Sequence, residues 1–194
     1  MHARYGRLLA TPLLSDLSRV ANLTAENLYR YGRQSLDEGD VAASSQCEIL
    51  NRILNNCRIS SSCRIGEGTS IAYGGIGVLI HSKSSIGRHC TIGSNVTVGG
   101  ASTIGDHVYV STGARIIGDG ISIGDFCIIG ANAVVTKDVP PCSVVGGVPA
   151  RLLKRLDRSN VGPYMGYLLG SKRAAHDYHD TFRSAFTTAS APGV

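Results

Sequence analysis

Residues 80–104 read IHSKSSIGRHCTIGSNVTVGGASTI, and in this stretch an aliphatic residue returns at every sixth position. The period continues in both directions, through Ile59, Ile65, Ile71, Ile80, Ile86, Ile92, Val98, Ile104, Val110, Ile116, Ile123, Ile129 and Val135. A six-residue period is the signature of a parallel β-helix, because each unit is a short strand plus a turn that cannot bury its apolar face alone. We therefore predict a mainly β fold, with a β-helix of a little over four coils.

The position two residues before each aliphatic is also expected to point inward, and it is small in most units. Four of the six cysteines occupy this position, at Cys57, Cys63, Cys90 and Cys127. We therefore interpret them as reduced packing residues rather than as disulfide partners or metal ligands. Ile121 is the bulky exception.

The period breaks in two places. The interval is nine residues between Ile71 and Ile80, within AYGGIG (72–77), and seven between Ile116 and Ile123. Each extra residue must leave the regular coil, so the breaks are candidate functional loops.

The flanks of the repeat divide the chain into three parts. We expect an N-terminal helical segment over 1–56, the β-helix over 57–150, and a C-terminal helical or irregular extension over 151–194. Within the first part, residues 13–36 have apolar residues at helical spacing, and Asn22 or Thr24 could cap a second helical segment.

Two further expectations concern the ends of the β-helix. DEGDVAASS (37–45) is interpreted as a linker, and 46–57 as an amphipathic segment whose Ile49, Leu50, Ile53 and Leu54 cover the open base. At the other end, Pro140, Pro141 and Pro149 are expected to end the regular coil. Beyond them, Tyr164, Tyr167, Leu168, Tyr178, Phe182 and Phe186 could form helices along a neighbouring subunit.

Composition excludes several classes of protein. The net charge is +5 and the basic residues are spread out, apart from RLLKRLDR at 151–158, which suits a phosphate-bearing ligand at least as well as nucleic acid. No apolar run is long enough to span a membrane, and MHARYGRLLATPLL lacks the features of a signal peptide. We expect a cytoplasmic protein with no nucleic-acid partner.

The period also predicts which side chains stack. His89 and His107 are 18 residues apart, one full coil, and so are Arg88 and Asp106. After correction for the two insertions the charged column extends to Glu67 and Asp125. Either this edge supplies a general base that a carboxylate orients, or it is a solvated ladder of alternating charges.

Two stretches resemble a known family. IGANAVVTKDVPPCSVVGGVPARLLKRL (129–156) is similar to the acetyl-CoA-binding end of hexapeptide-repeat acyltransferases, and residues 51–100 resemble their serine O-acetyltransferase branch. The resemblance implies a left-handed helix and a homotrimer, or a dimer of trimers. It also implies acetyl-CoA as co-substrate in clefts between prisms, and no metal. By motif match the cofactor would contact Gly113, Ala114, Ala131, Thr136, Lys137 and Arg151, although the first three could simply be small packing residues.

The chain departs from this family at its catalytic histidines. The first family histidine falls at Tyr73 or Gly74, and the second falls at Ala101. The remaining candidates for catalysis are His81 and His107 as bases and Tyr73 near the oxyanion or the acceptor, where its usual pKa near 10 makes it a poor base.

The resemblance implies an acetyl-CoA-dependent O-acetyltransferase that acts on a small hydroxylated acceptor. The acceptor would be serine or a sugar hydroxyl of a surface polysaccharide. Two alternatives stay open: a non-catalytic scaffold or CoA-binding protein that has lost the family histidines, and a sugar N-acetyltransferase.

Overall fold

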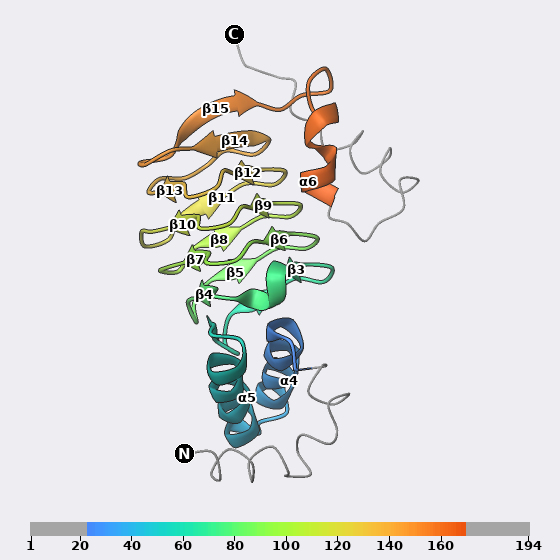
Figure 1. The fold of residues 1–194 in the computed structure, drawn as a ribbon, viewed down its shortest axis with the longest axis vertical. Helices are drawn as coiled ribbons and strands as arrows, with labels where there is room; N and C mark the ends of the chain where they lie inside the picture. The colour runs from blue at the N-terminus through green and yellow to red at the C-terminus, as the bar shows by residue number, and fades with distance from the viewer. Residues whose placement is uncertain (1–22, 170–194) are drawn as a thin grey trace, which may run out of the picture.

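The described part of the chain, residues 23–169 of a computed structural model, is a parallel β-helix that stands on a pair of helices (Figure 1). Its short strands are β1 (Arg58–Ile59), β2 (Arg64–Ile65), β3 (Ser70–Ile71), β4 (Leu79–Ile80), β5 (Ser85–Ile86), β6 (Thr91–Ile92), β7 (Thr97–Val98), β8 (Thr103–Ile104), β9 (Tyr109–Val110), β10 (Arg115–Ile116), β11 (Ser122–Ile123), β12 (Ile128–Ile129), β13 (Val134–Val135), β14 (Ser143–Gly146) and β15 (Arg151–Arg155). The predicted fold class is confirmed.

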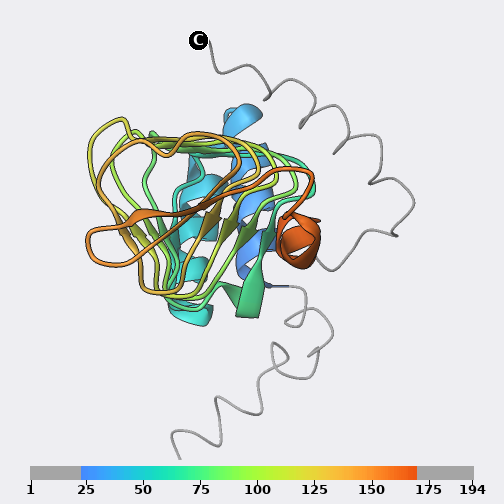
Figure 2. The ribbon, with the colours of Figure 1, turned by 90° about the horizontal axis from the view of Figure 1, so that it is seen from above.

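Every third strand pairs in parallel, which produces three sheets. We call them sheet A (β1-β4-β7-β10-β13), sheet B (β2-β5-β8-β11) and sheet C (β3-β6-β9-β12-β14-β15). The register follows the repeat, since Thr97 pairs with Arg115 and Ser85 with Thr103, 18 residues apart. Seen from above, the coils superpose in a roughly triangular outline (Figure 2).

The interior of the prism is filled as the repeat predicts. Seven isoleucines of the series are at most 2% exposed: Ile59, Ile80, Ile92, Ile104, Ile116, Ile123 and Ile129. Cys57, Cys63, Cys90 and Cys127 are buried with free thiols, and burial raises their pKa values to about 11, 12, 11 and 12. Since burial disfavours the thiolate, these cysteines are packing residues.

Two helices form the base of the prism. Thr24 caps α4 (Ala25–Asp37) by accepting a hydrogen bond from the Asn27 amide, and Asp40 caps α5 (Val41–Leu54) by accepting one from the Ala43 amide. The expected linker over 37–45 is therefore wrong beyond Asp40. An N-cap followed by alanines and serines is compatible with a helix, and packing against α4 stabilises it. No helix among residues 23–169 is long and apolar enough to cross a bilayer.

The expected packing of α5 is also wrong. Its buried side chains are the polar Ser44 and Asn51, while Ile53 is 69% exposed. Asn51 donates a hydrogen bond to the Ala25 carbonyl (3.0 Å) and accepts one from Asn55 (3.0 Å). A polar network fixes this helix, because satisfied buried amides are stable and specify orientation.

The end of the β-helix differs from expectation in two ways. β14 still pairs in parallel with β12, so the coil continues past Pro140 and Pro141, and β15 then adds antiparallel. The short helices η2 (Gly162–Tyr164) and α6 (Met165–Leu169) pack on sheet C of their own chain, where Leu168 is fully buried (Figures 1 and 2). Tyr178, Phe182 and Phe186 lie outside the described residues.

Candidate active site

The turns between sheets form three edges along the prism. The C–A edge comprises residues 72–78, 93–96, 111–114 and 130–133, and it continues upward through the β14–β15 turn (147–150), which stays within sheet C but hydrogen-bonds to Val134 of β13. The A–B edge comprises 60–63, 81–84, 99–102, 117–121 and 136–138. The B–C edge comprises 66–69, 87–90, 105–108, 124–127 and 140–142. Tyr73 lies on the first, His81 on the second and His107 on the third. One chain therefore does not bring the three catalytic candidates together.

The first break in the repeat forms a protruding loop on the C–A edge. Its 3₁₀ turn, η1 (Ala72–Gly75), includes Tyr73 in a left-handed conformation with φ 54° and ψ 35°. Such a conformation costs a non-glycine residue about 1–2 kcal/mol and is often found at functional sites. Tyr73 is 71% exposed. The loop rests on the base of the prism, since a Cβ at Gly75 would overlap that of Ala25 on α4.

His81 follows β4 directly and is exposed on the A–B edge. Its Nδ1 accepts a hydrogen bond from the backbone N–H of Lys83 (3.2 Å). In the neutral ring the proton therefore lies on Nε2, so His81 presents a donor to its surroundings. This geometry suits a group that stabilises negative charge better than a general base.

His107 lies inside a ladder of rings on the B–C edge. Its ring stacks on Phe126, with centroids 4.9 Å apart and planes within 4°, and lies 5.1 Å from the ring of His89. The predicted stacking of the two histidines is confirmed. Because His107 is only 6% exposed, it does not face an open cleft of the chain.

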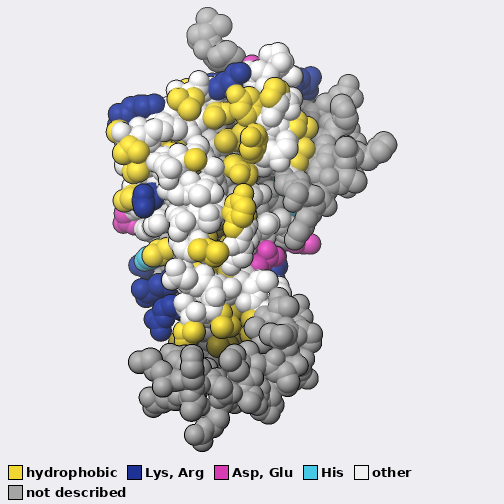
Figure 3. All heavy atoms as spheres, in the orientation of Figure 1, with side chains coloured by type: hydrophobic (Ala, Val, Ile, Leu, Met, Phe, Trp, Pro, Cys, Tyr) yellow, Lys and Arg dark blue, Asp and Glu magenta, His cyan; other side chains and the backbone are white. Residues whose placement is uncertain are grey.

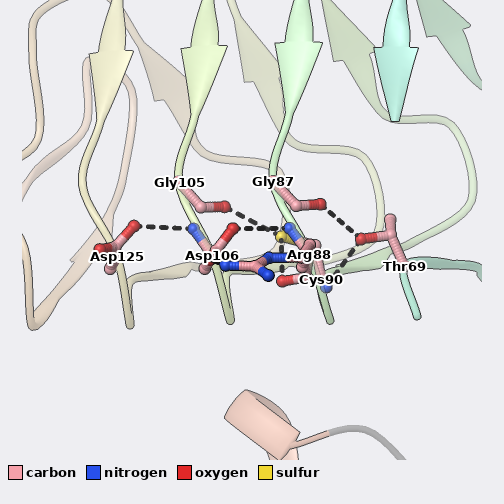
Figure 4. Close-up of polar contacts among 7 residues, drawn as sticks. All are labelled: Thr69, Gly87, Arg88, Cys90, Gly105, Asp106 and Asp125. Atoms are coloured by element: carbon pink, nitrogen blue, oxygen red, sulfur yellow. Dashed lines mark hydrogen bonds and ion pairs between the residues drawn. The ribbon is translucent and has the colours of Figure 1, made fainter. Parts of the chain in front are cut away.

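The charged column of the B–C edge is built by contacts to backbone amides (Figure 4). Asp106 accepts a hydrogen bond from the Arg88 amide (2.7 Å) and pairs with its guanidinium (3.3 Å), and Asp125 accepts one from the Asp106 amide (2.7 Å). Each carboxylate thus joins its own coil to the one below, which supports the ladder interpretation. Among residues 23–169, no cluster of His, Cys, Asp or Glu is arranged to hold a metal ion.

Two of the predicted cofactor residues, Gly113 and Ala114, are buried in the C–A edge. Their amides donate to the carbonyls of Ser94 (2.9 Å) and Ser111 (3.2 Å). Gly113 has φ 74°, and a Cβ there would overlap the side chain of Asn132. Their geometry favours the packing interpretation, and the recurrence of Asn and Gly at this corner is a sequence signal for it.

The other predicted cofactor residues are exposed near the top of the prism. Ala131 lies on the C–A edge and Arg151 begins β15 immediately after it, whereas Thr136 and Lys137 lie on the A–B edge. These two edges border sheet A, and they are the same edges that carry Tyr73 and His81. Candidate contacts thus face each other across sheet A.

Sheet A and its borders also carry large apolar side chains that the repeat did not predict. Tyr73, Ile76, Leu79, Ile117 and Val148 are each between 40% and 73% exposed. Lys and Arg side chains gather along the left border of the prism, on the side of the sheet A strands (Figure 3). The upper strands of sheet C, in contrast, pack against α6. Exposed apolar groups of this kind often mark an interface.

Comparison with known proteins relates the repeat, and up to three quarters of the chain, to one group of enzymes. Residues 83–118 match the family model described as bacterial transferase hexapeptide (six repeats). The chain is 38% identical over 108 residues to serine acetyltransferase of Mycobacterium tuberculosis, which covers 55% of this chain and 40% of that protein. It is 33% identical over 154 residues to serine acetyltransferase of Staphylococcus aureus, covering 75% and 71%.

Solved structures give the same result. A serine acetyltransferase in complex with CoA has a TM-score of 0.62 at 26% identity and covers 66% of this chain and 55% of that one. The Neisseria gonorrhoeae enzyme in complex with serine has a TM-score of 0.63 at 27% identity, covering 67% and 55%. The chain thus spans only about half the length of many of these relatives.

Proposed function

Because the chain belongs to the serine acetyltransferase family, we propose that it transfers the acetyl group of acetyl-CoA to the hydroxyl of a small acceptor, with serine as the first candidate. The observation that carries this proposal is the distribution of Tyr73, His81, Ala131, Thr136, Lys137 and Arg151. Five of them lie on the two borders of sheet A, and Arg151, the first residue of β15, directly follows the turn that continues the C–A border.

The site is completed between two copies of the chain. Tyr73 precedes β4 and His81 follows it, so they lie at the same height on opposite borders of one sheet. In a closed trimer of parallel prisms, the C–A edge of one chain can lie beside the A–B edge of the next. The exposed Tyr73, Ile76, Leu79 and Ile117 suit such an interface, whereas the upper strands of sheet C are covered by α6.

Acetyl-CoA would run along this cleft. Lys137 and Arg151 near the top of the prism are the cations for its phosphates, and Ala131 and Thr136 line the same borders. Gly113 and Ala114 keep the C–A edge narrow there. Tyr73 and His81 lie lower on the prism, where the thioester would be placed.

The reaction joins the acceptor oxygen to the acetyl carbonyl carbon and breaks the carbon–sulfur bond. The Nε2–H of His81 donates to the oxygen that becomes negative in the tetrahedral intermediate. The Tyr73 hydroxyl accepts the acceptor proton while it passes its own to the leaving sulfur, so no tyrosinate is required at neutral pH. The products are the acetyl ester and the free CoA thiol.

A sugar hydroxyl is the second candidate acceptor. The chain is 40% identical over 53 residues to galactoside O-acetyltransferase of Escherichia coli, which covers 27% of this chain and 26% of that protein. The match is short, so serine takes precedence.

The activity is tested by quantifying CoA release and acetylated product with serine, galactosides and amino sugars. Turnover above acetyl-CoA hydrolysis is expected, and it should fall in Tyr73→Phe and in His81→Asn by about tenfold or more. His89→Asn, on the B–C edge, is the matched control and should keep the activity. If no acceptor is acetylated while CoA still binds, the chain is a non-catalytic CoA-binding protein.

Mixed trimers test the shared site. When Tyr73→Phe and His81→Asn chains are co-expressed, about a quarter of the clefts should combine an intact Tyr73 with an intact His81. Activity should therefore return to about a quarter of the wild-type value. A site made within one chain would show no recovery.

A further inference from the structure

The helical base touches the segment that carries Tyr73. We call residues 72–78, which include η1, the Tyr73 loop. A Cβ built at Gly75 would overlap the Cβ of Ala25, the first residue of α4. Gly75 is buried, whereas the neighbouring Gly74 is exposed and has nothing within 4 Å of a built Cβ. The Tyr73 loop therefore has one side in solvent and one side seated on α4.

Ala25, the seat of this loop, is held in place by α5. The side-chain amide of Asn51 donates a hydrogen bond to the Ala25 carbonyl (3.0 Å). The side-chain oxygen of Asn51 accepts hydrogen bonds from Asn55 (3.0 Å) and from the Cys57 thiol (3.1 Å). Asn51 and Ala25 are both 1% exposed. A buried and satisfied network of this kind makes the seat rigid.

A second contact joins the loop to the end of α5. The carbonyl of Asn56, which follows the Asn55 cap of α5, accepts a hydrogen bond from the Gly77 amide (3.1 Å). One coil higher, the Ile76 carbonyl accepts one from the Asn95 amide in the same way (2.8 Å). The base thus takes the place of the coil that would otherwise lie beneath the loop.

The conformation of Tyr73 depends on such support. Its φ of 54° lies in the left-handed region, and Gly74, Gly75 and Gly77 also have positive φ angles. A strained non-glycine residue keeps such a conformation where the surrounding structure fixes it. Contacts at both Gly75 and Gly77 therefore determine where the Tyr73 side chain starts.

We propose that Ala25 and Asn51 are positioning residues, which fix where the hydroxyl of Tyr73 lies in the cleft. Both are buried, so neither touches a substrate, and they act through the backbone of residues 75–77. This inference rests on the proposed function, in which Tyr73 accepts the proton of the acceptor. It gives the two helices of the base a part in the rate of acetyl transfer.

Exchanging the two small residues at the contact tests the seat. Gly75→Ala should push the loop away from α4 and lower kcat several-fold. The KM for acetyl-CoA should stay within about twofold, because the proposed phosphate contacts lie at the top of the prism. Adding Ala25→Gly restores the space and should recover part of kcat. No recovery in the double variant would overturn the inference.

Gly74→Ala is the matched control for this exchange. Its φ of 69° is close to the 81° of Gly75, so alanine is strained at both positions, but it has no overlap at Gly74. The loss of kcat in Gly74→Ala should therefore be clearly smaller. An equal loss would show that backbone strain, and not contact with Ala25, lowers the activity.

The hydrogen bonds beneath the seat are tested separately. Asn51→Ala leaves the Ala25 carbonyl without this donor and should also lower kcat several-fold. Tyr29→Phe removes a buried hydrogen bond from the same base, near β2, and should keep kcat at a temperature at which both variants are folded. If the two variants lose kcat in proportion to their unfolding free energies, Asn51 has only a structural role and the inference fails.

Fluorine NMR reports the position of the loop without any turnover. In protein labelled with fluorotyrosine, the Tyr73 signal is assigned by its loss in Tyr73→Phe. This signal should shift in Gly75→Ala and in Asn51→Ala, and stay in place in Tyr29→Phe. Adding Ala25→Gly to Gly75→Ala should move it back toward its wild-type position.

The two readouts separate the inference from the proposed function. An unchanged Tyr73 signal in both variants would overturn the inference even if the activity fell, and so would a shifted signal with unchanged kcat. If the wild type acetylates no acceptor, the proposed function fails, and the Tyr73 signal alone decides whether the base positions the loop.

Discussion

The hydroxyl of Tyr29, on α4, donates a hydrogen bond of 3.0 Å to the carbonyl oxygen of Cys63 in the first coil of the β-helix. The Tyr29 hydroxyl oxygen itself accepts a hydrogen bond from the amide of Ile65 (3.0 Å). One buried phenol thus joins the helical base to the lowest strands, where the backbone has no coil below it to pair with.

Replacing this hydroxyl should loosen the base. Tyr29→Phe leaves a buried carbonyl and an amide without their partner, so the free energy of unfolding should fall by about 1–3 kcal/mol. Urea unfolding at pH 7 and fixed protein concentration measures the change. Tyr31→Phe, on an exposed ring of the same helix, should alter stability by much less, and equal effects would contradict the assignment.

The same phenol predicts a loss of stability at alkaline pH. Burial is the main cause that raises the pKa of Tyr29 from 10.0 to about 12. A raised pKa means that the folded state favours the protonated phenol, so this contribution is complete below pH 10 and is lost as pH rises from 10 through 12. The difference in unfolding free energy between wild type and Tyr29→Phe should shrink over that range. A constant difference would show that Tyr29 does not titrate as proposed.

Two glycines with nearly the same backbone should respond differently to alanine. Gly113 has φ 74° and Gly120 has φ 72°, but a Cβ at Gly113 meets Asn132, whereas nothing lies within 4 Å of one at Gly120. Gly120→Ala should lower the free energy of unfolding by about 1 kcal/mol, because alanine is strained in the left-handed conformation. Gly113→Ala should lower it clearly more, because its Cβ also meets a neighbour. Combining Gly113→Ala with Asn132→Gly should recover part of the loss in thermal unfolding. Equal costs would assign Gly113 to a role other than packing.

The cysteines should differ in reactivity. Cys57, Cys63, Cys90, Cys127 and Cys142 are buried and have raised pKa values, whereas Cys47 on α5 is partly exposed. Iodoacetamide at pH 8 should therefore label Cys47 first and the other five only after unfolding. Mass spectrometry of peptides identifies the sites, and Cys47→Ser should abolish the fast phase. Fast labelling of Cys90 in the native protein would contradict its place in the core.

The sequence by itself determined the β-helix. Because the inward position must be filled in every coil, Ile80, Ile92 and Ile104 carry a period that no surface requirement disturbs. The stacking of His89 on His107, and of Arg88 on Asp106, followed from the same count of residues. Because capping is a local interaction, the sequence also narrowed the helix cap to Asn22 or Thr24, and Thr24 is the cap.

The tertiary structure decided what depends on contacts between distant residues. Burial of Asn51 rather than Ile53 follows from hydrogen bonds to Ala25 and Asn55, which an apolar pattern cannot reveal. Burial of His107 depends on the neighbouring Phe126 ring, and the donor character of His81 depends on the Lys83 amide. The period gives the height of each residue along the prism. The packing around each side chain decides whether it faces solvent and, for His81, which ring nitrogen carries the proton.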